Sequence, residues 1–202
     1  VLVRHARADE GPTQGLVLHT EESFLLVGAE TPAGRRLEAF QIELRLLAHF
    51  SEDPVLTESF RNGEDIHTRT AAEVFGVMPG MVSPEMRRGA KAVNFGIVYG
   101  QTAFGLASQL GIPKKEAEIY IRNYFDRYQG VKRWIESTIE DVRAKGHTRT
   151  LFGRVRPIPD MDARNPNARS FAERTAVNTP LQGSAADLIK IAMIRIDRAL
   201  SE

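Results

Sequence analysis

The chain has 202 residues, 42% of them hydrophobic, and its 27 basic side chains nearly balance its 26 acidic ones. It has no cysteine, which excludes disulfides, thiol catalysis and Cys-ligated zinc and fits a reducing cytoplasm. No apolar run approaches ~18 residues and the first residues lack a signal-peptide pattern, so we expect a cytoplasmic protein without a membrane span. Residues 87–156 carry 14 Lys and Arg against 6 Asp and Glu, a net +8 that favours polyanion binding.

The first 40 residues predict only short strands. Residues 15–19 and 23–28 are apolar runs that suggest a hairpin, with a turn near residues 31–34. Residues 41–49 then open a helix, because Ile42 and Leu46 lie on one apolar stripe.

Two further helices are expected after a break at Asp53-Pro54. They cover residues 55–60 and 65–75, and the second has apolar residues at helical spacing. A third helix should begin after Ser83, which can cap it, with Pro84 in the first turn. Gly100 is expected to end it.

The helix at residues 84–99 has a row of cationic and aromatic side chains along one side. Arg87, Lys91, Phe95 and Tyr99 follow one another at intervals of four, a row about 18 Å long. Arginine and lysine suit phosphate oxygens, and the two rings offer flat faces for a base or sugar. The row can hold a nucleoside triphosphate lengthwise, although a helix with a solvated basic start and a buried aromatic end would give the same spacing.

The rest of the chain is mostly helical. Residues 103–110 predict a short helix, and residues 114–128 and 131–145 predict an antiparallel pair joined around Gly130. Residues 148–160 predict a hairpin with a Gly-Arg turn. Residues 172–187 predict helix interrupted at Pro180, followed by a final helix over residues 185–200.

The chain resembles family A DNA polymerases, the bacterial DNA polymerase I group. The resemblance rests first on Arg87-Arg88, Lys91, Asn94-Phe95-Gly96 and Tyr99-Gly100 in register, which match the family's fingers helix. Residues 41–45, 148–156 and 172–187 are similar to further family segments. The implied fold is α+β and mainly helical, with the fingers helices of a right-hand polymerase and part of its palm.

The resemblance implies a domain plan and a set of nucleotide-binding residues. Residues 1–40 are unassigned or partial palm, 41–63 a palm portion, 64–160 the fingers, and 161–202 palm helices that return from the fingers. Arg87 and Lys91 would act in catalysis. The residues that would bind the deoxynucleoside triphosphate are Gln41, Glu43, His67, Arg87, Lys91, Phe95 and Tyr99. Glu43 would exclude a ribose 2′-hydroxyl, which disfavours an RNA-synthesising relative.

The resemblance also implies contacts with primer-template DNA. Arg174, Asn178 and Gln182 recur at intervals of four, and their donors suit backbone and minor-groove acceptors. Arg154 is a fourth candidate, which either meets phosphate or pairs within the protein.

The metal-binding carboxylates of the family lack clear counterparts. In one alignment Glu38 occupies the position of the first catalytic aspartate; in another, the strand that carries this aspartate is missing and Glu38 is no substitute. The His-Asp-Glu motif that supplies the second aspartate is absent from the 202 residues. The resemblance implies Mg²⁺ as a cofactor, and Glu38 is the one candidate ligand for it in this sequence.

The predicted function is DNA-directed DNA polymerisation, a nucleotidyl transfer. We expect a fragment that is inactive alone and that works with further palm and thumb segments. A non-catalytic nucleotide- or DNA-binding remnant and a helical structural module are the alternatives.

Overall fold

The computed structural model describes residues 28–30, 36–38 and 41–201, which divide into two units at residues 44 and 45. In the first unit, β1 (Gly28–Glu30) pairs antiparallel with β2 (Arg36–Glu38), and Gly28 lies opposite Glu38. The strand expected at residues 15–19, most of that at 23–28 and the turn at 31–34 lie outside the described residues. The first helix begins in this unit.

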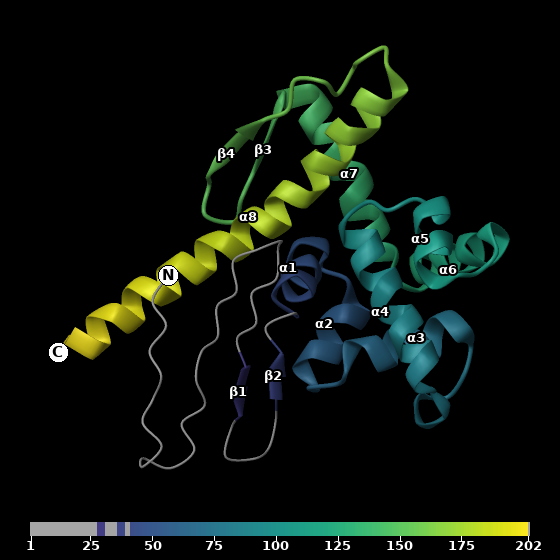
Figure 1. The fold of residues 1–202 in the computed structure, drawn as a ribbon. Helices are drawn as coiled ribbons and strands as arrows, with labels where there is room; N and C mark the ends of the chain where they lie inside the picture. The colour runs from purple at the N-terminus through teal and green to yellow at the C-terminus, as the bar shows by residue number, and fades with distance from the viewer. Residues whose placement is uncertain (1–27, 31–35, 39–40, 202) are drawn as a thin grey trace. The chain divides into compact units, whose positions relative to one another are not determined.

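The described helices confirm a mainly helical α+β fold (Figure 1). In chain order they are α1 (Ile42–Ser51), α2 (Pro54–Arg61), α3 (Ile66–Phe75), the 3-10 turn η2 (Pro79–Met81), α4 (Pro84–Val98), α5 (Ala103–Leu110), α6 (Lys114–Arg127), α7 (Gln129–Lys145) and α8 (Pro166–Ser201). A hairpin of β3 (His147–Arg149) and β4 (Val155–Pro157) separates α7 from α8. No helix in the described ranges is both long and apolar enough to cross a membrane.

Capping side chains set the helix starts where the sequence predicted them. Ser83 accepts a hydrogen bond from the N–H of Met86 at 3.2 Å and begins α4. Asp53 begins α2 in the same way, with Pro54 at the first position of the helix. Gly100 follows α4 with φ +63°, a left-handed conformation that glycine adopts without strain, so the helix ends as expected.

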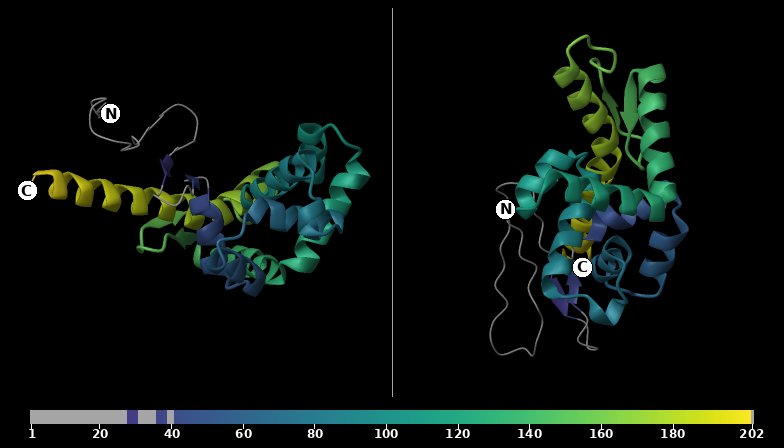
Figure 2. Two further views of the ribbon diagram at one scale, coloured as in Figure 1. Left: turned by 90° about the horizontal axis from the view of Figure 1, so that it is seen from below. Right: turned by 90° about the vertical axis from the view of Figure 1, so that its right-hand side faces the viewer.

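Within residues 45–202, one group of helices surrounds α4. α3 lies along α4 so closely that a Cβ on Gly89 would be 3.2 Å from Cζ of Phe75. α6 packs on α3 and α5, and both its Tyr124 and the residue that follows the helix, Tyr128, are fully buried. The two views of Figure 2 show these helices gathered about α4. This packing buries one side of α4 and fixes its other side relative to α3.

A second cluster joins α7, the hairpin and α8. Val142 from α7, Ile158 after β4, and Ala172 and Ala176 from α8 form its buried core. Ser184 of α8 accepts a hydrogen bond from the N–H of Leu151 at 2.8 Å, which attaches the hairpin turn to the helix.

Two expectations about the helices are wrong. α6 and α7 are not an antiparallel pair, because α6 packs chiefly on α5 and α3 while α7 packs on α8 and β3. The interruption at Pro180 is also absent: α8 runs unbroken through it. Proline removes one helical hydrogen bond, but Pro180 and its neighbour Leu181 are buried, and this packing holds the helix together across the lost bond.

Candidate nucleotide-binding site

The predicted row on α4 forms a half-exposed strip along a helix that is otherwise buried over most of this length. Arg87, Lys91, Phe95 and Tyr99 are each partly exposed, whereas their neighbours from residue 89 onward are buried. The rings of Phe95 and Tyr99 are stacked, with centroids 6.2 Å apart and planes inclined by 15°. The strip therefore has a cationic end and an aromatic end, as the spacing predicts.

His67 from α3 lies against this strip. Its ring centroid is 5.9 Å from that of Phe95, and only 1% of the residue is exposed. Burial lowers the pKa of His67 to about 4; the carboxylate of Asp65 opposes this shift, and the charges of Arg87 and Lys91 add to it. The imidazole is therefore neutral near pH 7, and its Nε2 is buried without a hydrogen-bond partner among the described residues.

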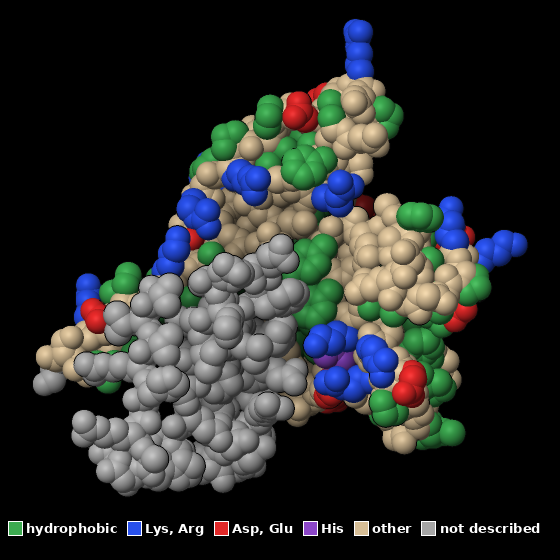
Figure 3. Space-filling model, in the orientation of Figure 1, with side chains coloured by type: hydrophobic (Ala, Val, Ile, Leu, Met, Phe, Trp, Pro, Cys, Tyr) green, Lys and Arg blue, Asp and Glu red, His purple; other side chains and the backbone are tan. Residues whose placement is uncertain are grey.

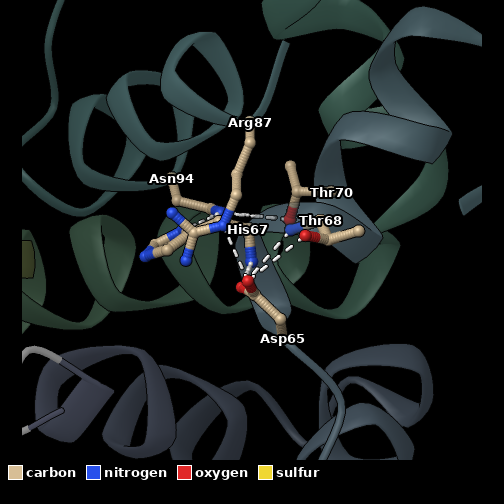
Figure 4. Close-up of polar contacts among 6 residues, drawn as sticks. All are labelled: Asp65, His67, Thr68, Thr70, Arg87 and Asn94. Carbon is tan, nitrogen blue, oxygen red and sulfur yellow. Dashed lines mark hydrogen bonds and ion pairs between the residues drawn. The ribbon is translucent and has the colours of Figure 1, made fainter. Parts of the chain in front are cut away.

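An ion pair joins the start of α3 to the start of α4 (Figure 4). Nε of Arg87 lies 2.7 Å from Oδ2 of Asp65, which also caps α3 through the N–H groups of His67 and Thr68. Burial raises the pKa of Asp65, but these hydrogen bonds and the charge of Arg87 outweigh it and hold the pKa below its usual value. With His67 neutral, Arg87, Lys91 and Asp65 leave one net positive charge. Figure 3 shows basic side chains beside a histidine on this face.

The far end of α4 meets α8. A Cβ on Gly100 would lie 2.7 Å from Cγ of Arg174, so the two chain segments are in contact there. The guanidinium of Arg174 donates to Ser170 Oγ at 2.7 Å. Asn178 and Gln182 follow at intervals of four on the continuous helix, and Oδ1 of Asn178 is buried without a partner in the described part of the chain.

Arg154 pairs within the protein. Its Nη2 lies 3.0 Å from Oδ1 of Asp187 and donates to the carbonyl of Gly183 at 3.0 Å. The guanidinium thereby attaches the hairpin turn to α8. A contact between Arg154 and DNA stays a prediction.

A buried polar group with no role assigned from the sequence lies beside His67. Asn94, Thr70 and Tyr128 are buried, and their side chains form a connected set of hydrogen bonds that reaches the imidazole. A polar Asn94 inside the apolar run from Ala92 to Val98 was the available signal, because a buried amide needs partners.

Three predicted site residues lie in the first unit. Glu38 is in β2 opposite Gly28, and Gln41 and Glu43 lie just before and at the start of α1. The strip on α4 belongs to the second unit, so the roles of these three residues in nucleotide and metal binding stay predictions.

The described residues offer no clear place for a divalent metal ion. Among the side chains that the structure describes, those of residues 41–201, no group of three or more His, Asp or Glu is arranged to hold one. The Mg²⁺ implied by the resemblance, with Glu38 as its candidate ligand, stays a prediction.

The fold is that of a class of protein, the polymerase domains. The solved POL domain of Pol1 from M. smegmatis, in a complex with DNA primer-template and dNTP, matches with a TM-score of 0.76 and 45% identity. The match covers 80% of this chain and 28% of that one. The chain belongs to DNA polymerase family A, whose family model matches residues 37–202.

Curated relatives agree with this family. The chain is 55% identical over 161 residues to DNA polymerase I of Streptococcus pneumoniae strain R6, covering 79% of this chain and 18% of the relative. It is 50% identical over 176 residues to the thermostable DNA polymerase I of Thermus filiformis, covering 87% and 20%. The chain thus spans about a fifth of the length of these relatives.

Proposed function

We propose that this chain binds a deoxynucleoside triphosphate and primer-template DNA as the fingers and part of the palm of a DNA-directed DNA polymerase. In this proposal, residues 41–63 are a palm portion, 64–160 the fingers and 161–202 the returning palm helices, while residues 1–40 are unassigned or partial palm. The observation that carries it is the half-exposed strip on α4 beside a neutral, buried His67.

The strip orders the parts of the nucleotide. Arg87 and Lys91 neutralise phosphate oxygens, and Nε2 of His67 donates a hydrogen bond to them. The stacked rings of Phe95 and Tyr99 accept the base or sugar at the other end. The resemblance assigns Gln41 and Glu43 to the sugar, where a carboxylate would exclude a ribose 2′-hydroxyl, and this assignment is independent of the strip.

The DNA lies along α8. Arg174, Asn178 and Gln182 present donors at intervals of four residues, or about 6 Å. Arg174 also touches the turn after α4, which joins the DNA contacts to the nucleotide strip. Arg154 supports this helix from the hairpin and is the weakest candidate for direct DNA contact, because Asp187 already holds it.

We propose that the 202 residues alone bind both substrates and do not join them. Nucleotidyl transfer by this family implies divalent metal, and the described residues provide no metal-binding group. Glu38 remains the candidate carboxylate, and further palm and thumb segments would supply the others. DNA as substrate fits a cytoplasmic location.

The test combines binding and extension in the same samples. Purified chain is titrated with a fluorescent deoxynucleoside triphosphate and with labelled primer-template, and extension is followed with Mg²⁺ and all four deoxynucleotides. Lys91→Ala should weaken triphosphate binding by 10-fold or more, since a charge-assisted contact contributes about 1.5–3 kcal/mol. Lys115→Ala, an equal loss of charge at an exposed site on α6, is the matched control.

Each outcome has a distinct meaning. Binding without extension supports the proposal, and extension refutes the inactive-fragment part of it. If wild-type chain binds neither substrate, the helical structural module is the better description.

A further inference from the structure

Asn94 of α4 is fully buried, and its amide lies between two side chains of α3 (Figure 4). Its Nδ2 is 3.1 Å from Nδ1 of His67, and its Oδ1 is 3.1 Å from Oγ1 of Thr70. The hydroxyl of Thr70 also lies 3.2 Å from the hydroxyl of Tyr128. The imidazole of His67 is therefore the end of a buried chain of hydrogen bonds.

We propose that Asn94 is a positioning residue that holds His67 in the tautomer with its proton on Nε2, so that Nε2–H is kept as a donor for an oxyanion bound beside α4. The identity of that oxyanion, a phosphate of a nucleoside triphosphate, rests on the proposed function. The tautomer itself does not.

The hydrogen-bonding capacity of each group leads to this tautomer. An amide NH₂ can only donate, so Nδ1 of His67 accepts and carries no proton. In the structure the amide lies with Nδ2 toward Nδ1 of His67, and Oγ1 of Thr70 is 3.1 Å from both Oδ1 and Nδ2 of Asn94. The hydroxyl of Thr70 is also bonded to that of Tyr128, where either oxygen can donate. Burial raises the pKa of Tyr128 to about 12, although its hydrogen bond with Thr70 opposes this, so the phenol is protonated near pH 7 and the chain of hydrogen bonds carries no charge at this end.

The other ring nitrogen has no partner in the described part of the chain. Nε2 of His67 is buried and unbonded, and a buried donor without an acceptor is unfavourable. The charged groups that act on the ring are Asp65 on its own helix and Arg87 and Lys91 from α4. Two cations beside an unbonded N–H suit a bound anion. The chain of hydrogen bonds thus ends at Nε2 of His67, and in the proposed tautomer this atom is a donor without an acceptor among the described residues.

The tautomer can be read directly in the wild-type chain. The ¹⁵N shifts of histidine side chains, assigned with a His67→Gln spectrum, should show at pH 7 an unprotonated Nδ1 and a protonated Nε2 for His67. A proton on Nδ1 would overturn the proposal. This measurement needs no nucleotide, so it stands even if the proposed function fails.

A variant that reverses the donor tests the consequence for binding. In Asn94→Asp, the carboxylate accepts a hydrogen bond from Nδ1–H, so neutral His67 carries its proton on Nδ1, presents the lone pair of Nε2 to phosphate, and binding weakens. The new carboxylate also raises the pKa of His67, so lowering the pH restores the proton on Nε2. Relative to wild type at the same pH, triphosphate affinity should fall 10-fold or more at pH 8 and recover to within about 3-fold at pH 6. A ratio that does not change with pH would contradict the proposal.

A second variant covers the case in which Asn94→Asp does not fold. Thr70→Val preserves shape but removes the hydroxyl that is hydrogen-bonded to the amide of Asn94, so the amide is held less firmly and the ¹⁵N spectrum of His67 should show a mixture of tautomers. An unchanged tautomer in Thr70→Val would remove Thr70 from the mechanism proposed for Asn94. Wild-type chain that binds no triphosphate at any pH would instead refute the proposed function alone.

Discussion

Removing the side chain of Asp53 should destabilise the chain far more than removing an ordinary helix cap. The carboxylate is 1% exposed and accepts three backbone hydrogen bonds. Oδ1 accepts from the N–H groups of Val55 and Leu56 at 3.0 and 3.2 Å, and Oδ2 accepts from the N–H of Gly130 at 2.8 Å. The last bond crosses 77 positions of sequence and attaches the start of α2 to the start of α7.

The magnitude has two parts. Loss of the cap costs about 1 kcal/mol, and leaving the buried N–H of Gly130 without an acceptor costs about 1–3 kcal/mol more. Asp53→Ala should therefore lower the free energy of unfolding by about 2–4 kcal/mol. Ser83→Ala, which removes a cap with only a local bond, should cost about 1 kcal/mol.

Urea unfolding measures both variants. The single tryptophan, Trp134 of α7, stacks on Phe50 of α1 with ring centroids 5.8 Å apart, and its fluorescence reports the region that Asp53 attaches. If Asp53→Ala costs no more than Ser83→Ala, the long-range bond to Gly130 adds nothing and the reasoning fails.

Three further results are expected. Gly100→Ala should lower the free energy of unfolding in urea by about 1–2 kcal/mol, because φ is +63° and the new methyl group would lie 2.7 Å from Cγ of Arg174. The same variant should weaken primer-template binding, and unchanged stability and affinity would contradict this contact. A pKa of about 4 for His67 in the folded chain, below the ordinary 6.5, means that the unfolded chain takes up this proton first as the pH falls. Wild type should therefore lose up to about 3 kcal/mol of unfolding free energy between pH 6.5 and 4 that His67→Gln does not lose, and parallel pH profiles would refute this. Arg87→Ala should change stability by no more than about 1 kcal/mol, because Arg87 and Asp65 are 38% and 40% exposed, and a loss above 2 kcal/mol in the same assay would mean that the pair has a structural role.

The helix boundaries could be predicted because their causes are local. A cap lies within three residues of the N–H that it accepts from, and the start at Ser83 follows from that spacing. Asp53, expected only as a break before a helix at residue 55, caps α2 in the same local way. The strip from Arg87 to Tyr99 is equally local, since four residues of helix return a side chain to the same face. These features need only the sequence of one segment.

The polar connections could not be predicted because they join segments far apart in the chain. Asn94 meets His67 across 27 positions, and Asp53 meets Gly130 across 77. At Pro180 the local rule gave a wrong prediction. Proline usually interrupts a helix, but α8 continues through Pro180 because this residue is buried against its neighbours. Tertiary packing decided each of these cases, and a single sequence contains no direct measure of it.

The unbroken course of α8 through Pro180 places the side chains that we propose to contact DNA on one rigid body. Arg174 and Gln182 lie on opposite sides of the proline and are about 12 Å apart along one axis, at 1.5 Å per residue. Two helices with a flexible junction would have to be ordered each time DNA bound, at a cost in conformational entropy. In one continuous helix that ordering has already taken place when the protein folds. Arg174, Asn178 and Gln182 therefore shift together whenever the helix moves.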